Sequence, residues 1–273
     1  MKSLRTIAIM STTAAATFVA GGGVMAWATG SGTAPRQPTS SAVPHIAAPI
    51  DTAIESKYTP ISPCRIVDTR SAGGPIAAGH LRSFYAAGTV GFAAQGGNSV
   101  GCGIPSAATA IAVTVIAVGA TGSGYLRAWA YGSTQPTSSF FNYANSLAVT
   151  GAGNVPINGT GARHFVVSAT SHSTNVVIDV TGYFIRPLTA NVAPDGTLTH
   201  GSRVTASTSL NTGVYVVDFD RDVSNCAYSL TSFVAGVVGE TQPRGGDVNG
   251  VYAHFVNTSG AFTATEFYLI VDC

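Results

Sequence analysis

The chain has 273 residues and a formal net charge of +1, with 45% apolar residues but only 9% charged ones. A nearly neutral chain without a concentrated basic run argues against nucleic acid or an anionic membrane surface as a partner. Thirty-two glycines and thirteen prolines, spread between short β-branched runs, predict an all-β protein and argue against a helical enzyme.

The first 28 residues have the order of an export signal. Lys2 and Arg5 precede an uncharged run that ends in Ala26-Trp27-Ala28, the small-x-small pattern that a signal peptidase accepts. The alternative is an uncleaved membrane anchor, because the run is long enough to span a bilayer. We therefore expect a secreted or cell-surface protein that contacts a membrane only if this segment remains attached.

The rest of the chain divides by composition into a linker and two folded regions. Residues 29–57 are rich in Pro, Ser, Thr and Ala without periodicity, which is typical of a disordered linker. We expect β domains at 58–186 and 196–273, each a sandwich or a barrel-like fold, joined by a Pro-containing connection at 187–195.

The most strongly patterned stretch, 110–131, is predicted to be a β-hairpin in the core of the first domain. Its first arm is Val-, Ile- and Thr-rich with apolar residues on both faces, so we expect it to be covered on both sides. The second arm places one row on a single strand face: Tyr125, Arg127, Trp129 and Tyr131.

Weaker strands are predicted on either side of this hairpin. Residues 58–70 include a short strand, 81–86 and 138–144 are further strands, and 151–161 is read as turns. A final hairpin is expected from 164–169 and 175–184.

Four segments of the first domain resemble a known module. PCRIVDTR (63–70), CGIPSAATAIAVTVIAV (102–118), GYLRAWAYG (124–132) and VVIDVTGYF (176–184) look like a β-rich module of exported and surface proteins from actinobacteria and other environmental bacteria. The resemblance covers about 60–186 and implies a secreted or cell-surface accessory role without an established catalytic activity. It supplies no functional residues. In the C-terminal region, GVYVVDF (213–219), CAY (226–228) and FYLIVDC (267–273) resemble another module of exported bacterial proteins.

The second domain is predicted to contain strands at 213–219, 226–234, 248–256 and 262–273. In the last of these, Phe267, Leu269 and Val271 share a face with Cys273, while Tyr228 and Leu230 share a face with Cys226. These inward rows predict a buried disulfide.

Four cysteines permit three pairings, and export to an oxidising compartment favours their oxidation. Sequence order favours Cys64 with Cys102 and Cys226 with Cys273. Each domain then holds one complete bridge, whereas crossed pairings would join the two domains.

One serine motif is a candidate catalytic site. Residues 97–101 match G-x-S-x-G around Ser99, but a nucleophile elbow needs a strand before the serine and a helix after it. We read this segment as a loop, and no other catalytic signature or cofactor site is predicted.

Metal binding is expected to be absent at the scattered histidines, which are His45, His80, His164, His172, His200 and His254. Asp218, Asp220 and Asp222 alternate like calcium ligands, but Val223 and Ser229 stand where an EF-hand needs Gly and Glu. They form either an edge calcium site or a solvated edge that blocks aggregation.

Asp68 and Arg70 share a face and are expected to pair with each other or with Asp179.

Three functions follow from these patterns. The first is a non-catalytic secreted or surface module for adhesion, assembly or extracellular structure, with a polysaccharide or a cell-surface protein as partner. The second is a carbohydrate-binding module that uses the aromatic row on 125–131, although aromatic residues are also common in ordinary sheet packing. The third is an enzyme, which needs a cleft with paired titratable groups.

Overall fold

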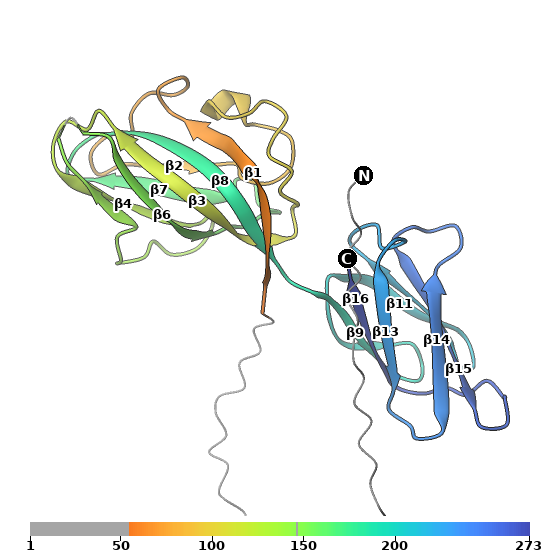
Figure 1. The fold of residues 1–273 in the computed structure, drawn as a ribbon. Coiled ribbons are helices and arrows are strands. Elements are labelled where there is room, and N and C mark those ends of the chain that lie inside the picture. Colours follow the sequence, from red (N-terminus) through yellow and green to blue (C-terminus); the bar gives the residue numbers. More distant parts are fainter. Residues whose placement is uncertain (1–54, 146) are drawn as a thin grey trace, which may run out of the picture. The chain divides into compact units, whose positions relative to one another are not determined.

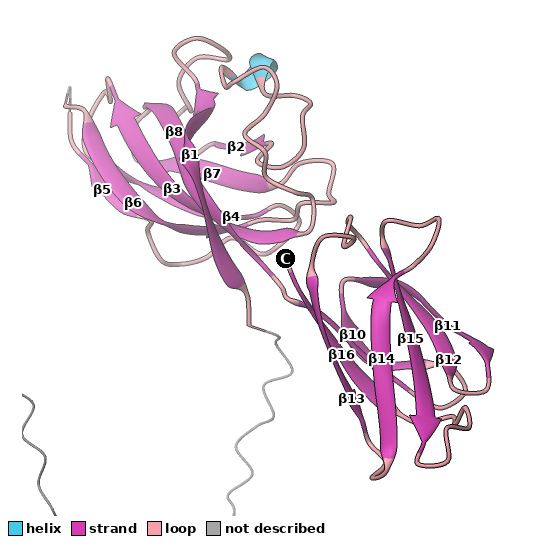
Figure 2. Ribbon diagram, turned by 45° about the vertical axis from the view of Figure 1, so that its right-hand side comes forward, coloured by secondary structure: helices cyan, strands magenta, loops and turns pink. Residues whose placement is uncertain are grey.

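The computed structural model describes residues 55–145 and 147–273. The predicted export signal and nearly all of the predicted linker lie outside these residues. The described chain is all-β, with sixteen strands in four antiparallel sheets (Figures 1 and 2). We call the two sheets of residues 57–185 the first sheet pair and the two sheets of residues 188–272 the second sheet pair.

The first sheet pair contains eight strands and one short 3-10 helix, η1. They are β1 (Lys57–Asp68), β2 (Leu81–Phe84), η1 (Ala93–Gln95), β3 (Ala108–Val118), β4 (Gly124–Ala130), β5 (Phe141–Tyr143), β6 (Val149–Pro156), β7 (Phe165–Thr170) and β8 (Asn175–Ile185).

The strand order of the first sheet pair is that of a jelly roll. One sheet has the order β1-β8-β3-β6 and the other has the order β2-β7-β4-β5. A jelly roll is a sandwich of two such sheets built from two Greek keys. Alternate residues of facing strands fill a common core, with Ile111, Val113 and Val115 of β3 packed in one cluster with Leu126 of β4 and Phe165 of β7. The alternation of β-branched residues therefore places one face of each strand in the interior.

The predicted hairpin at 110–131 is wrong in its pairing, although both strands exist. β3 pairs with β6 and β8, whereas β4 pairs with β5 and β7 in the opposite sheet. The glycines between the two arms thus carry the chain from one sheet to the other. The outward residues of β3 are only half-buried: Ala112, Thr114 and Ile116.

The predicted hairpin of 164–169 with 175–184 is wrong for the same reason. β7 and β8 also lie in different sheets, and β8 pairs with β1 and β3. In addition, part of the stretch read as turns, 151–161, belongs to strand β6. Gly151 lies directly beneath the ring of Phe141, so the absence of a side chain gives the ring its space.

The second sheet pair contains eight further strands: β9 (Leu188–Val192), β10 (Leu198–Ser202), β11 (Val204–Asn211), β12 (Val214–Phe219), β13 (Ala227–Ser232), β14 (Val237–Pro243), β15 (Gly250–Asn257) and β16 (Phe267–Asp272).

These strands form two sheets with the orders β10-β9-β16-β13 and β11-β12-β15-β14. Their inward rows meet in a second hydrophobic cluster that is separate from the first, in which Tyr215, Phe255 and Phe267 pack ring against ring. The four strands predicted from the sequence correspond to β12, β13, β15 and β16.

Four strands of this region were not predicted. β9 lies inside the stretch read as the connection, where it pairs with β16 and buries Leu188, Ala190 and Val192. β10, β11 and β14 consist largely of polar residues and Gly, so their sequences lack the apolar alternation that marks a half-buried strand.

Both predicted disulfides are confirmed. Cys64 is bonded to Cys102 with a Cα–Cα distance of 5.8 Å, and Cys226 is bonded to Cys273 with a Cα–Cα distance of 4.5 Å. Phe267, Leu269 and Val271 are buried as expected. Cys273 itself is exposed, so the second bridge lies at the rim of its sheet instead of in the core.

Candidate functional site

The outer face of β4 holds three members of the predicted aromatic row. Leu126 points into the core, and the alternation of the strand therefore directs Tyr125, Arg127 and Trp129 to the opposite face. Tyr131 lies just beyond the end of the strand and is 38% exposed. Trp129 is only 7% exposed, so its ring does not present an open surface for stacking.

A loop returns across this outer face. Residues 131–140 connect β4 to β5, and the Nε2 of Gln135 donates a hydrogen bond to the Oγ of Ser168 over 3.3 Å. Ser168 lies directly across from Arg127 in the pairing of β7 with β4. Gln135 therefore reaches the residue that faces Arg127.

Arg127 is a half-buried cation without a carboxylate partner. Its Nη2 donates a 3.3 Å hydrogen bond to the hydroxyl of Tyr125, and its guanidinium carbon lies 5.2 Å from the centre of the Tyr125 ring. Its Nε is buried and has no hydrogen-bond acceptor. Within residues 55–145 and 147–273, no carboxylate lies within ion-pair distance of it.

A second surface, which the sequence reading missed, lies on the outside of the sheet β10-β9-β16-β13. Tyr268 and Ile270 of β16 point away from the core and are 43% and 51% exposed. Phe233, just after β13, is 55% exposed and its ring centre lies 4.9 Å from that of Tyr268. We call these three residues the β16 patch. The alternation in FYLIVD already separates Tyr268 and Ile270 from the buried Phe267 and Leu269, and this signal could have identified the patch.

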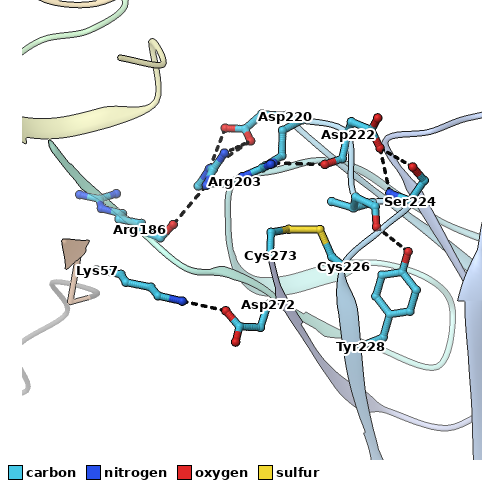
Figure 3. The surroundings of a disulfide bond; sticks show 12 residues. Lys57, Arg186, Arg203, Asp220, Asp222, Ser224, Cys226, Tyr228, Asp272 and Cys273 are labelled. Atoms are coloured by element: carbon cyan, nitrogen blue, oxygen red, sulfur yellow. Dashed lines mark hydrogen bonds and ion pairs between the residues drawn. A yellow bond between two sulfur atoms is a disulfide. The ribbon is translucent and has the colours of Figure 1, made fainter. Parts of the chain in front are cut away.

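The alternating aspartates each have a local partner, and Figure 3 shows the partners of Asp220 and Asp222. Asp218 accepts from Arg244 at 2.8 Å and Asp220 accepts from Arg203 at 2.7 Å. The side-chain and backbone donors of Ser224 bind Asp222 and lower the pKa of this carboxyl. In the described part of the chain, no group of three or more His, Cys, Asp or Glu side chains is arranged to hold a metal ion.

The ion pair of Asp68 with Arg70, at the end of β1, is arranged as predicted. Arg70 binds Asp68 at 2.7 Å, and this hydrogen bond lowers the pKa of the buried Asp68 carboxyl. Arg65 binds Asp179 at 2.8 Å and approaches Asp68 at 3.4 Å. These charges are satisfied within the fold and give no reason to expect a ligand.

Ser99 lies on an exposed turn between η1 and β3. The segment is held by backbone hydrogen bonds from Asn98 to Arg65 and from Gly101 to Asn98. It has the loop structure expected from the sequence, without the strand-to-helix geometry of a nucleophile elbow.

A hollow with a volume of about 460 Å³ is lined by charges of both signs. Lys57 and Asp272, which form an exposed ion pair at 2.9 Å, lie in its wall together with Arg203 and Asp220 (Figure 3). Because cations and carboxylates both lie in its wall, and Lys57 and Arg203 are already paired with Asp272 and Asp220, this hollow offers no selective site for an ion.

No family model, curated protein or solved structure matches the chain. Among the described residues, no helix is long and apolar enough to cross a membrane. His45 and the predicted export signal fall outside the described residues. Among the described residues, His80, His164, His172, His200 and His254 are not clustered as metal ligands.

Proposed function

We propose that this protein is a non-catalytic extracellular module for adhesion or assembly, and that the β16 patch is its contact surface. The observation that carries the proposal is the exposure of Phe233, Tyr268 and Ile270 on the outside of a sheet whose other face is the core. Contiguous exposed apolar side chains on a folded domain mark interaction sites. Aromatic residues are also enriched at the centres of protein interfaces.

The polar neighbours of the patch support a specific contact surface. Thr231 of β13 lies directly across from Tyr268, and Ser229 lies directly across from Ile270. On the other side, Asn191 of β9 pairs with Tyr268 and is buried, with an Oδ1 that lacks a hydrogen-bond partner. A rim of polar groups around apolar side chains is the usual composition of a transient interface.

Residues 1–28 would direct export of the module, and the two sheet pairs would act as separate domains. The two disulfides support an oxidising extracellular environment. Separate hydrophobic clusters support the division into domains at about 186, as does the resemblance of 60–186 to a secreted accessory module. N-terminal sequencing of secreted protein tests the export signal: a chain that still begins at Met1 and fractionates with membranes contradicts it.

The adhesion proposal can be tested by measuring the retention of purified protein on insoluble polysaccharides and on bacterial envelopes, with and without their surface proteins. We expect Tyr268→Ser combined with Ile270→Thr to lose retention, because the variant removes apolar contact area without touching the core. Val238→Thr, on the exposed edge strand β14 of the other sheet, is the matched control. Sedimentation of the wild type at increasing concentration detects a second copy as the partner.

Two results contradict the proposal: equal retention of the double variant and the wild type, or loss of retention in the control alone. Far-UV circular dichroism of both variants shows whether the fold is preserved.

Carbohydrate binding at the outer face of β4 is the second candidate. The burial of Trp129 argues against a ring that stacks on a sugar here, but Arg127, which has no carboxylate partner among the described residues, favours a polar ligand at this position.

A further inference from the structure

Three arginines of this protein bind an aspartate through the same edge of the guanidinium group. In each pair Nε and Nη2 donate two hydrogen bonds to the carboxylate, which is the side-on form of the arginine fork. The distances are 2.8 and 3.0 Å for Arg65 with Asp179, 2.9 and 2.7 Å for Arg70 with Asp68, and 3.0 and 2.7 Å for Arg203 with Asp220.

The same edge of Arg127 lacks its carboxylate. Nε is buried without an acceptor, and Nη2 has only the hydroxyl of Tyr125 at 3.3 Å. A buried charged donor without a partner is costly, because it has lost its water and gained no hydrogen bond in return. Binding of an external carboxylate would remove this cost.

We infer that Arg127 binds a carboxylate of an acidic polysaccharide on the outer face of β4. The charge of the site is complementary to a uronic acid unit, and its planar donor edge matches the two carboxylate oxygens. This site lies on the first sheet pair, so the inference does not depend on the β16 patch.

The groups around Arg127 fit a sugar better than an acidic peptide segment or a bare anion. Tyr125 provides a ring next to the guanidinium, and exposed Asn142 lies directly across from Tyr125 on β5. Ser168 and Gln135 add a hydroxyl and an amide on the other side. Neutral donors and acceptors around one cation suit a ring that carries hydroxyl groups and a single carboxylate.

Gln135 would be displaced when the ligand enters. Its side chain belongs to an exposed residue and is held to Ser168 by one 3.3 Å hydrogen bond. Ser168 lies directly opposite Arg127 on β7, so we expect release of this contact to make the Nε edge more accessible. Gln135→Ala should therefore bind a uronate at least as tightly as the wild type.

The test is a calorimetric titration of the folded full chain with polygalacturonate and, in parallel, with neutral dextran. We expect binding of polygalacturonate alone, and a loss of affinity of roughly tenfold or more in Arg127→Gln. Arg127→Lys should also lose affinity, because an ammonium keeps the charge but not the planar fork. Arg221→Gln is the control, since this exposed arginine forms, among the described residues, a hydrogen bond only to the backbone oxygen of Asp222.

Thermal unfolding of each variant shows whether it is folded, and if Arg127→Gln is not, Arg127→Lys decides the result. The inference is overturned if the wild type does not bind polygalacturonate or if both Arg127 variants bind it normally. Equal binding of poly-glutamate would replace the sugar with an acidic protein, and equal binding of dextran sulfate would show unselective anion binding. Both results reject the proposal, and neither affects retention through the β16 patch.

Discussion

The backbone N–H of Ala86 donates a 2.8 Å hydrogen bond to Nδ1 of His164 in the interior of the first sheet pair. The N–H of Ala87 donates to the same nitrogen, also at 2.8 Å. A protonated imidazole has no acceptor, so His164 must be neutral in the folded protein. Burial lowers the pKa of His164 below its ordinary value of 6.5, and the charge of Arg163 lowers it further.

The stability of the protein should therefore fall on mild acidification. Below about pH 6.5 the unfolded chain takes up a proton on His164 that the folded chain does not. The stabilising contribution is complete above that pH and is lost progressively as the pH falls toward the lower pKa of the folded state. Urea unfolding at a series of pH values between about 5 and 8 measures this loss.

His164→Asn is the matched variant, because its carboxamide oxygen can accept the same backbone donors but does not titrate in this range. We expect a flatter dependence of the unfolding free energy on pH. A variant with the same slope as the wild type would assign the dependence to another group.

Removal of the bridge between Cys226 and Cys273 should destabilise the second sheet pair selectively. Its loop spans 47 residues, for which the chain-entropy model gives a stabilisation of about 4 kcal/mol. β16 lies between β9 and β13, so detachment of this strand from the sheet exposes the backbone edges of both neighbouring strands. We expect a Cys226→Ser, Cys273→Ser variant to be cleaved by protease within 188–273 while the first sheet pair stays intact.

The corresponding Cys64→Ser, Cys102→Ser variant is the control, and its cleavage should fall in the first sheet pair instead. Identical resistance of the wild type and the Cys226 variant to protease would show that the bridge is not needed for stability. Non-reducing peptide mapping confirms which bridges are present before either comparison.

Tyr215→Phe should lower the free energy of unfolding by about 1–3 kcal/mol, since it leaves a buried donor unsatisfied. The hydroxyl of Tyr215 donates to the oxygen of Pro194 at 2.9 Å and accepts from the backbone N–H of Thr265 at 3.2 Å. It thereby fixes two loops next to the core. Chemical denaturation measures the effect, with the exposed Tyr131→Phe as a control expected to change stability little.

Gly96→Ala should cost more stability than Gly74→Ala. Both glycines have a positive φ, 77° and 67°, so both substitutions introduce backbone strain of about 1 kcal/mol or more. A side chain at Gly96 would also overlap the backbone oxygen of Asp68, whereas the space around Gly74 is open. The difference between their unfolding midpoints isolates the steric contribution, and equal midpoints would show that the backbone of Asp68 moves away freely.

The positions of most central strands could be predicted, because buried alternation is a local property of the sequence. Both disulfides could be predicted from the order of the four cysteines, which places one pair in each predicted domain. Which strands lie next to each other in a sheet could not be predicted in this way. β3 and β4 are adjacent in sequence and joined by glycines, yet they do not pair with each other. β3 pairs with β6 and β8, and β4 pairs with β5 and β7. Alternation indicates which face of a strand is buried but does not specify its neighbour.

In the candidate site, too, some features follow from strand alternation and others depend on three-dimensional packing. The common face of Tyr125, Arg127 and Trp129 follows from the period of a strand. The contact between Gln135 and Ser168 depends on how a polar loop folds back, for which the sequence has no periodic signal. The absence of a carboxylate near Arg127 is a property of three-dimensional packing alone.

The pairing of β1 with β8 also determines when the first sheet pair can form. Lys57 lies opposite Ile185, and Asp68 lies opposite Val177, so β1 has no sheet partner until β8 is available. If the chain emerges from a ribosome or a translocation channel with its N-terminal end first, β1 must wait unpaired through the emergence of six further strands. Such distant pairing slows folding, because a long loop must close before its contacts form.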